Sequence, residues 1–407
     1  RFAVVAGGPG TGKTTTVARI LALLLEQSPG EPPLVALAAP TGKAMQRLEE
    51  AVHEAADDPR FAAAREFMLG LSASTLHKLL GARPGTNRRR HHRGNRLPHD
   101  VVIVDETSMV SLSMMARLVE AVRPEARLIL VGDPNQLSSI EAGAVLSDIV
   151  KARREGVVEL DHTFRFGAGI GELASAIRRD DADAALEVLR GGRDDVQWIE
   201  ADLAEPEAMD ALAGVRAAAL DAARAVIRAA RDGDAEGALD ALGSFRVLCA
   251  HRHGPYGVST WMARIEAWLE SELERGRWYL GRPLLVTEND YSLNLRNGDT
   301  GVVVATPAGG VEAVFERRAE IVRFAPTRLS AVETVYAMTV HKSQGSQFRT
   351  VVVLLPPPSS PLLTRELLYT AVTRAQERLV LVGGEAAVRT AVEHPIARAS
   401  GLGRRLR

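Results

Sequence analysis

The sequence has almost no cysteine, since Cys249 is the only one in 407 residues. An internal disulfide or a zinc site built from cysteines therefore cannot form within this chain. Such a composition fits a reducing compartment, and we expect a cytoplasmic protein. Long apolar runs are also missing: no segment reaches the roughly 20 residues of a membrane-spanning helix, and none has the pattern of a signal peptide.

An excess of charge of one sign is missing as well, because 50 basic residues stand against 51 acidic ones. The overall charge therefore gives no indication of nucleic-acid binding, which would need a local basic patch. A chain of this length is too long for one small hydrophobic core, so we expect two or three domains. The chain begins at Arg1 directly before an apolar run, and we expect a piece of a longer protein whose N-terminal part is missing.

The clearest motif that is present is GGPGTGKTTT at residues 7–16, which fits G-x-x-x-x-G-K-[ST]. A short apolar run at 2–6 predicts a buried parallel strand before it, and an Ala- and Leu-rich run at 14–26 predicts a helix after it. Its glycines let backbone N–H groups approach phosphate oxygens at the start of that helix. The residues expected around the phosphates of ATP are Gly8, Pro9, Gly10, Thr11, Gly12, Lys13, Thr14 and Thr15.

Lys13 is expected to reach the β- and γ-phosphates, and the Thr14 hydroxyl is expected to bind Mg²⁺. A second strand supplies carboxylates, because the apolar run VVIV at 101–104 is followed directly by Asp105 and Glu106. Asp105 can hold Mg²⁺ at a strand end, and Glu106 can orient and deprotonate an attacking water. An acidic pair alone is weak evidence, but together with the glycine loop in one sheet it indicates nucleoside triphosphate hydrolysis.

Two further predicted strands end in polar residues. The run at 128–131 leads to GDPNQ, where Gln136 can bind the γ-phosphate without adding negative charge, although an ordinary Asp-Pro-Asn turn is equally compatible. The run at 157–160 leads to Arg165. The strand at 34–39 leads to APTGKA, in which Thr41 and Lys43 could contact ATP or a nucleic-acid backbone, or Thr41 could simply cap the next helix.

The most basic segment is RRRHHRGNR at residues 88–96. It is bracketed by Pro84-Gly85 and by Pro98, and chain breakers at both ends predict a projecting loop or hairpin. A run of charge is commonly just a solvated surface, so a basic loop without a specific role is the plain alternative. The histidines nearby have no cysteine or carboxylate cluster beside them, which argues against a metal site.

The second half of the chain changes pattern twice. Residues 281–329 show short alternating strands separated by Asn-Asp, Asn-Gly-Asp and Gly-Gly turns, which is typical of β-hairpins. The α/β pattern then resumes around the polar loop TVHKSQG, where Thr339, His341 and Ser343 offer donors to phosphate and Gly345 allows close approach. Residues 364–376 predict a helix with Arg374 near its end, where an arginine commonly compensates the helix dipole.

Taken in order, GGPGTGKTTT, APTGKA, STLHKLLG, VVIVDETSM, LVGDPNQL and TFRF resemble the motifs of superfamily 1 helicases. FRVLCAHRHGPYGV, GRPLLVTENDYSLNLRNGDTGVV, VYAMTVHKSQGSQF and TRELLYTAVTRAQERLVL resemble the RecD family, the alpha chains of exonuclease V (RecBCD). The resemblance covers nearly the whole chain. This sequence lacks the family's N-terminal domain and the upstream segment whose glutamine reads the adenine ring. Residues 169–243 carry no motif.

The resemblance implies an α/β fold of two RecA-like P-loop parallel-sheet domains that enclose ATP and Mg²⁺, with a small inserted SH3-like β-barrel. We expect motor domain 1A at 1–168, with a basic hairpin at 83–99 that acts as a strand-separating pin. A helical connector follows at 169–243. Motor domain 2A is expected at 244–280 and 330–407, and insert 2B at 281–329.

The resemblance also implies an ATP-dependent DNA helicase that moves 5′→3′ on single-stranded DNA. It would be the motor subunit of a RecBCD-type helicase-nuclease in double-strand break repair and recombination, with RecB-like and RecC-like partners bound through the missing N-terminal domain. The implied catalytic set is Lys13, Asp105, Glu106, Gln136, Arg165 and Arg374, with Gly345 also at the nucleotide. The expected DNA contacts are Pro40, Thr41, Lys43, His77, Arg88, Arg89, Arg90, Thr339, His341 and Ser343.

Three alternatives stay open at this point. A P-loop kinase or metabolic NTPase would need a small-molecule acceptor pocket and no second α/β domain. A non-motor subunit could use its ATP site only for regulation, although the full set of catalytic residues argues against this. A stand-alone RecD-like helicase would work without partner chains.

Overall fold

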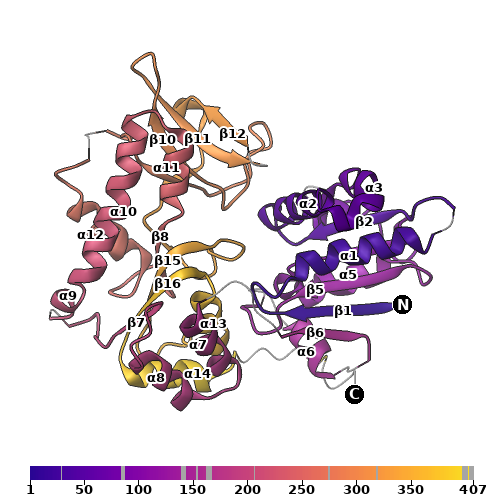
Figure 1. Cartoon of the computed structure of the whole chain (residues 1–407), viewed down its shortest axis with the longest axis horizontal. Helices are drawn as coiled ribbons and strands as arrows, with labels where there is room; N and C mark the ends of the chain where they lie inside the picture. Colours follow the sequence, from indigo (N-terminus) through magenta and orange to yellow (C-terminus); the bar gives the residue numbers. More distant parts are fainter. Residues whose placement is uncertain are drawn as a thin grey trace. The chain divides into compact units, whose positions relative to one another are not determined.

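The computed structural model of the chain describes residues 1–28, 30–83, 88–138, 144–152, 155–161, 167–205, 207–273, 276–317, 320–396 and 402. The chain divides into two compact units (Figure 1). Unit 1 comprises Arg1–Arg165 with Ala397–Arg407, and unit 2 comprises Phe166–Ile396. No helix in the described ranges is both long and apolar enough to cross a membrane.

Unit 1 is built on six parallel strands in the order β3-β2-β4-β5-β1-β6. The central strands are short apolar runs buried on both faces, as expected for a parallel sheet covered by helices. Val4 pairs with Leu130 and Leu130 with Val104, so the carboxyl ends of β1, β5 and β4 lie next to one another. The strands are β1 Phe2–Gly7, β2 Val35–Ala39, β3 Ala73–Thr75, β4 Val101–Val104, β5 Arg127–Gly132 and β6 Val157–Leu160.

Helices cover both faces of this sheet. Leu21 of α1 and Leu48 of α2 contribute to the core on one face, and Leu76 of α4 and Leu118 of α5 to the core on the other. The helices are α1 Lys13–Glu26, α2 Gly42–Ala56, α3 Arg65–Leu69, α4 Leu76–Leu79, α5 Leu112–Ala121 and α6 Val145–Ala152, with 3₁₀ turns at Pro59–Ala64 and Thr107–Met109. The predicted strand–loop–helix arrangement around the glycine motif is confirmed.

Unit 2 contains a second parallel sheet in the order β14-β8-β15-β16-β7. Its core on one face includes Trp261 and Ile265 of α12 Val258–Trp268, packed with Val247 and Val352 of the sheet. The predicted α/β domain in the second half is therefore confirmed. The strands are β7 Val196–Ile199, β8 Phe245–Cys249, β14 Ala337–Thr339, β15 Phe348–Leu354 and β16 Ala375–Val382.

Between α12 and β14 the chain forms a five-stranded antiparallel sheet in the order β12-β11-β10-β9-β13. The sheet extends to Thr334, beyond the predicted end at 329, because β13 pairs with β9. Its order is open, with β12 and β13 at the two edges, so the SH3-like barrel stays a prediction. The strands are β9 Pro283–Val286, β10 Thr300–Ala305, β11 Val311–Arg317, β12 Glu320–Phe324 and β13 Val332–Thr334, with a 3₁₀ turn at Pro326–Arg328 before β13.

The stretch 169–243 differs from the predicted helical connector, because it supplies β7 at an edge of the parallel sheet. The strand is only four residues long and lies within Ala-rich helical sequence, so the hydrophobic pattern of this stretch did not indicate a strand. Two helices of this stretch pack on α13 and α14, and two cover the antiparallel sheet through residues such as Val226 and Ala238. The helices of unit 2 not yet given are α7 Ala168–Arg178, α8 Ala182–Arg190, α9 Ala208–Ala211, α10 Ala213–Arg231, α11 Ala235–Leu242, α13 Arg365–Val372 and α14 Glu385–Glu393.

The C-terminal boundary also differs from the prediction, which placed the chain to residue 407 in the second motor domain. Leu402 packs against the core of unit 1 that contains Leu118 and Leu146. The predicted boundary at residue 168 lies close to the observed division after Arg165.

Candidate functional site

The loop between β1 and α1 is a tight turn that requires its glycines. Gly10 and Gly12 both have a φ of 79°, in the left-handed region that residues with side chains rarely adopt. A Cβ atom at Gly7 would lie 2.4 Å from Thr11 Oγ1, which donates a hydrogen bond to Gly8 O at 2.9 Å. A side chain at Gly7 would therefore displace the Thr11 hydroxyl and open the loop.

The first N–H groups of α1 have no side-chain cap, because the N-cap residue is Gly12, and no acidic residue lies in the first turn. A helix start of this kind suits an anion. Lys13 Nζ donates to Gly7 O and Gly8 O, both at 2.8 Å. The predicted phosphate contacts, residues 8–15, thus lie together in one loop and the first turn of one helix, which also carries Thr14.

Asp105 and Glu106 directly follow β4, at the same edge of the sheet as the glycine loop. Asp105 Oδ1 accepts a hydrogen bond from Glu106 N at 2.8 Å, and Glu106 has a φ of 49°. Burial raises the pKa of Asp105 to about 6 and the Glu106 charge adds to this rise, whereas the charge of Lys13 acts in the opposite direction. The pairing of β1 and β4 with β5 brings the two motifs to the same edge of the sheet, close enough for the charge of Lys13 to act on Asp105.

The end of β5 packs against the turn that carries this acidic pair. A Cβ atom at Gly132 would lie 3.1 Å from Thr107 N, and the buried Thr107 hydroxyl donates to Val104 O at 2.9 Å. The residues that follow β5 therefore lie beside Asp105.

Gln136 is held by a side chain to which the sequence pattern assigned no role. The Gln136 side-chain amide donates to Asp133 Oδ2 at 3.1 Å, and Asn135 N donates to Asp133 Oδ1 at 3.0 Å. Asp133 is 1% exposed, so its carboxylate serves this turn. The sequence GDPN already indicated a turn in which an aspartate side chain accepts hydrogen bonds from the residues after it. The Asp-Pro-Asn turn is confirmed, and a role for Gln136 at the γ-phosphate stays a prediction.

The predicted contacts outside the nucleotide loop are spread over unit 1. Thr41 Oγ1 accepts a hydrogen bond from Ala44 N at 3.2 Å, so Thr41 caps α2, and half-buried Pro40 and Lys43 flank it after β2. His77 is exposed on α4, at the end of β3. Arg165 lies outside the described residues.

The described part of the basic segment is tied to the body of unit 1 at both ends. Arg89 forms an antiparallel bridge with Ala82, and Leu97 N donates to Ala121 O at 2.8 Å. Between them, His92 and Asn95 exchange two backbone hydrogen bonds, which makes a tight turn. Arg88 and Arg90 are exposed, whereas Arg89 is half-buried. Residues 84–87 lie outside the described residues, so the pin stays a prediction.

In unit 2 the loop after β14 is held by its own hydroxyl groups. Thr339 Oγ1 accepts from Lys342 N at 3.2 Å. Ser343 is fully buried, and its hydroxyl donates to Val340 O at 2.8 Å. As folded, the Ser343 hydroxyl stabilises the loop, and its contact with DNA stays a prediction. His341 is half-buried in the same loop, and Gly345 has a φ of 72°.

Arg374 lies in the short link between α13 and β16. The helix ends at Val372, whereas the sequence predicts a helix to residue 376, because the strand begins at Ala375. The Arg374 side chain is 3% exposed. Its Nε donates to Thr370 O at 3.1 Å and its Nη1 to Ser346 O at 3.2 Å. Arg374 is thus anchored on carbonyl groups of its own unit, and its contact with a γ-phosphate stays a prediction.

Metal-binding clusters of another kind are not found in the described ranges, where no three His, Cys, Asp or Glu side chains group together. The carboxylate of Asp105 and the hydroxyl of Thr14 are hard oxygen donors of the type that Mg²⁺ prefers. The donor set near the glycine loop therefore fits a magnesium–nucleotide complex better than a zinc site.

Comparison with known proteins agrees with this geometry. A family model described as an AAA domain matches residues 1–201, and one described as a UvrD-like helicase C-terminal domain matches residues 334–382. The chain is 56% identical to the RecBCD enzyme subunit RecD of Mycolicibacterium smegmatis, over 99% of this chain and 72% of that protein.

Two other relatives are similar over most of this chain. The RecBCD enzyme subunit RecD of Haemophilus influenzae is 33% identical over 100% of this chain and 70% of that protein. The ATP-dependent RecD2 DNA helicase of Deinococcus radiodurans is 32% identical over 95% of this chain and 47% of that protein. Among solved structures, the Pif1 helicase from Candida albicans matches with a TM-score of 0.48 and 15% identity, covering 98% of this chain and 94% of that chain.

Proposed function

This chain belongs to the family of the RecBCD enzyme subunit RecD, and from that membership we propose that it is an ATP-dependent superfamily 1 DNA helicase that moves 5′→3′ along single-stranded DNA. We propose further that it acts as a motor subunit in a helicase-nuclease assembly for double-strand break repair and recombination. RecB-like and RecC-like chains are its proposed partners, because its relatives are named as subunits of the RecBCD enzyme.

The observation that carries the ATPase part is that two motifs follow strands β1 and β4, whose carboxyl ends lie on either side of β5. The glycine loop after β1 places Lys13 where its charge lowers the pKa of Asp105 after β4, against the rise caused by burial. A lysine and a buried carboxylate in one site match the needs of a phosphate group and its metal ion. A P-loop kinase would share these features, but the second parallel sheet with Arg374 favours the helicase.

The residues present fit ATP with Mg²⁺. Thr14 and Asp105 would hold Mg²⁺, which neutralises phosphate charge when it is bound. Lys13 and the first N–H groups of α1 bind the phosphates. Glu106 orients the attacking water and accepts its proton.

Three further side chains are proposed to act on the transferred γ-phosphoryl group. Gln136, held by Asp133, reports its presence through its amide. Arg165 and Arg374 stabilise the charge that develops on it, as arginine fingers do. Gly345 is assigned to the nucleotide as well, because it directly precedes Ser346, whose carbonyl accepts a hydrogen bond from Arg374.

DNA contacts are proposed for Pro40, Thr41 and Lys43, for His77, for Arg88, Arg89 and Arg90 of the basic segment, and for Thr339, His341 and Ser343. Backbone amides, hydroxyls and cationic groups of this kind contact phosphates without reading sequence. The Ser343 hydroxyl donates to Val340 O in the folded loop, so a phosphate would have to replace that carbonyl as its acceptor.

The test is the ATPase rate of the full-length protein, alone and with its partner chains, with and without single-stranded DNA. Strong stimulation by DNA supports a motor, whereas indifference to DNA would favour a kinase or a regulatory subunit. Activity of the isolated full-length chain equal to that of the assembly would favour a stand-alone helicase.

Direction is tested on partial duplexes that carry one single-stranded tail. Unwinding from a 5′ tail and not from a 3′ tail is expected. Unwinding from the 3′ tail alone would contradict the proposed polarity and leave the ATPase assignment intact.

A further inference from the structure

Arg246, on β8 of unit 2, is a buried cation that has no carboxylate partner among the described residues. Its side chain is 2% exposed, and none of the ion pairs in the described ranges includes it. Burial lowers the pKa of Arg246 to about 10, which still leaves the guanidinium charged at neutral pH. A buried charge of this kind is costly unless directional contacts compensate for it.

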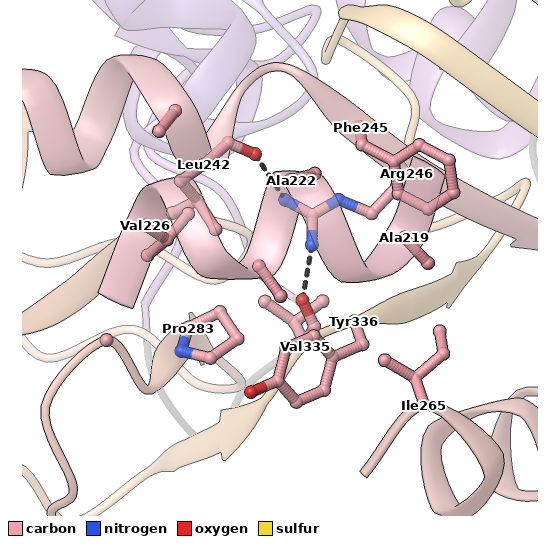
Figure 2. A pocket seen from close by; sticks show the side chains of 13 residues that line it. Ala219, Ala222, Val226, Leu242, Phe245, Arg246, Ile265, Pro283, Val335 and Tyr336 are labelled. Atoms are coloured by element: carbon pink, nitrogen blue, oxygen red, sulfur yellow. Dashed lines mark hydrogen bonds between the residues drawn. The ribbon is translucent and has the colours of Figure 1, made fainter. Parts of the chain in front are cut away.

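Two backbone carbonyls and one aromatic ring supply those contacts. The guanidinium donates to Leu242 O at the end of α11 (3.0 Å) and to Val335 O in the link between β13 and β14. Figure 2 shows it between these two carbonyl oxygens. The apolar pocket beside it has a volume of about 30 Å³, which has room for a water or two. The contacts that hold the guanidinium are these protein groups.

The third contact leads toward Arg374. The Arg246 guanidinium lies 4.9 Å from the centre of the Phe348 ring, in cation–π geometry. Phe348 N donates to Arg374 O at 3.0 Å, and in the sheet Phe348 pairs with Ala375. Two residues before Phe348, Ser346 O accepts the hydrogen bond from Arg374 Nη1.

The segment 346–348 thus binds both the main chain and the side chain of Arg374. Arg246 packs on the Phe348 ring of that segment. Arg246 also fixes the two chain connections that lead to the antiparallel sheet and its covering helix, through Val335 and Leu242. A leucine or methionine could fill the same volume without a desolvation cost. What an aliphatic side chain cannot supply is a planar group that binds two carbonyls and stacks on a ring in one orientation.

We propose that Arg246 is a positioning residue for ATP hydrolysis, which acts through Phe348 to hold Arg374 in the orientation needed at the γ-phosphoryl group. The inference depends on the role proposed above for Arg374. Arg246 touches no reacting atom itself.

The experiment measures the affinity of the full-length protein for ADP and for ADP with aluminium fluoride, which imitates the transferred phosphoryl group. The variants are Arg246→Lys, Arg246→Met and Phe348→Leu, with Arg374→Ala as reference. Loss of a correctly placed finger weakens aluminium fluoride binding selectively, and we expect roughly a tenfold loss for both Arg246 variants with ADP affinity within about twofold. Phe348→Leu should lie between these variants and the parent protein.

A matched control separates positioning from folding. Trp261→Phe changes another fully buried residue of unit 2, one whose ring nitrogen bonds to Pro255 O, away from Arg374. Trp261→Phe should lower the melting temperature. It should leave unchanged the ratio of the affinity for ADP with aluminium fluoride to the affinity for ADP alone. Adding Arg246→Met to Arg374→Ala should produce no further change in the ratio, because the positioning group then has nothing to position.

Two results would overturn the inference, and they differ from each other. If Arg374→Ala alters the ratio but Arg246→Lys and Phe348→Leu do not, Arg246 only stabilises the fold and the role of Arg374 survives. If Arg374→Ala leaves the ratio unchanged, the finger role fails and the positioning role fails with it.

Discussion

The two parallel sheets of this chain differ in the edge that carries their proposed catalytic residues. In unit 1 the glycine loop, Asp105 and Gln136 all follow strands, so they lie at the carboxyl edge, where α/β sheets commonly bind ligands. In unit 2 the Thr339 loop also begins at the carboxyl edge. Arg374 instead precedes β16, and Ser346 precedes β15, so the proposed finger belongs to the amino edge.

The two regions also hold their functional groups differently. Lys13 is half-buried and bonded to carbonyls of its own loop, which a phosphate can replace. Arg374 is buried, and its partners Thr370 and Ser346 belong to two different segments of unit 2. We infer that substitution of Lys13 affects chemistry alone, whereas substitution of Arg374 at the amino edge of unit 2 affects chemistry and stability together.

The largest effect is expected for Lys13→Ala. Removal of a cationic clamp on the phosphates should lower ATP turnover by roughly 10³-fold or more. The melting temperature should stay close to that of the parent, because the hydrogen bonds of the Lys13 amine go to carbonyls of its own loop. Lys78→Ala, at an exposed lysine of α4, is the control and should change neither quantity. Near-normal turnover in folded Lys13→Ala protein would remove the nucleotide assignment.

Arg374→Ala tests the other side of the comparison. As an arginine finger it should lower turnover by roughly 10³-fold while nucleotide still binds. Removal of its bonds to buried carbonyls should also lower the free energy of unfolding by about 1–3 kcal/mol. An ATPase assay paired with a denaturant melt measures both.

The control for Arg374 is Arg349→Ala, near the start of β15. Arg349 pairs with Asp240 on a partly exposed surface, and such pairs contribute about 1 kcal/mol or less. Turnover should not change. If Arg374→Ala loses stability but retains turnover, the amino edge of unit 2 is structural and the contrast between the two sheets disappears.

A smaller effect is expected for the basic segment. Changing the exposed Arg88, Arg90 and Arg93 to glutamine removes three cations and leaves Arg96, which donates to Val122 O at 2.6 Å, in place. DNA-stimulated ATPase should persist, because the nucleotide site is unchanged. Strand separation should fall, and the salt dependence of DNA affinity should weaken by a slope of about 1 for each phosphate that the protein no longer neutralises. Unwinding equal to that of the parent would show that the segment is only a solvated loop.

The smallest effect is expected for helix caps, one in each unit. Thr41 caps α2 and Thr364 caps α13, where Thr364 Oγ1 accepts from Leu367 N at 3.4 Å. Replacing either with alanine should lower the free energy of unfolding by about 1 kcal/mol. Thr41→Ala should in addition weaken DNA-stimulated ATPase if Thr41 contacts DNA. If both variants lose the same free energy of unfolding and neither changes DNA-stimulated ATPase, Thr41 serves only as a helix cap.

Most of unit 1 could be predicted because its signals are local. The strand, loop and helix around Lys13 follow from glycines and apolar runs within residues 2–26, and Asp105 follows four consecutive buried residues. The structure confirms these elements. In unit 2 the prediction of a connector at 169–243 was wrong at β7, because a four-residue edge strand has no pattern of its own and exists only through pairing with β16.

The sequence alone determined the phosphate loop, because left-handed backbone at Gly10 and Gly12 and the lack of space at Gly7 are properties of neighbouring residues. Only the tertiary structure decided what surrounds Arg246 and Arg374, two of the buried arginines of unit 2. Arg374 bonds to a carbonyl 28 positions away, and Arg246 to one 89 positions away. Such partners meet only when separate strands assemble into one sheet, and burial then requires each guanidinium to bond to whatever carbonyl the packing brings within reach.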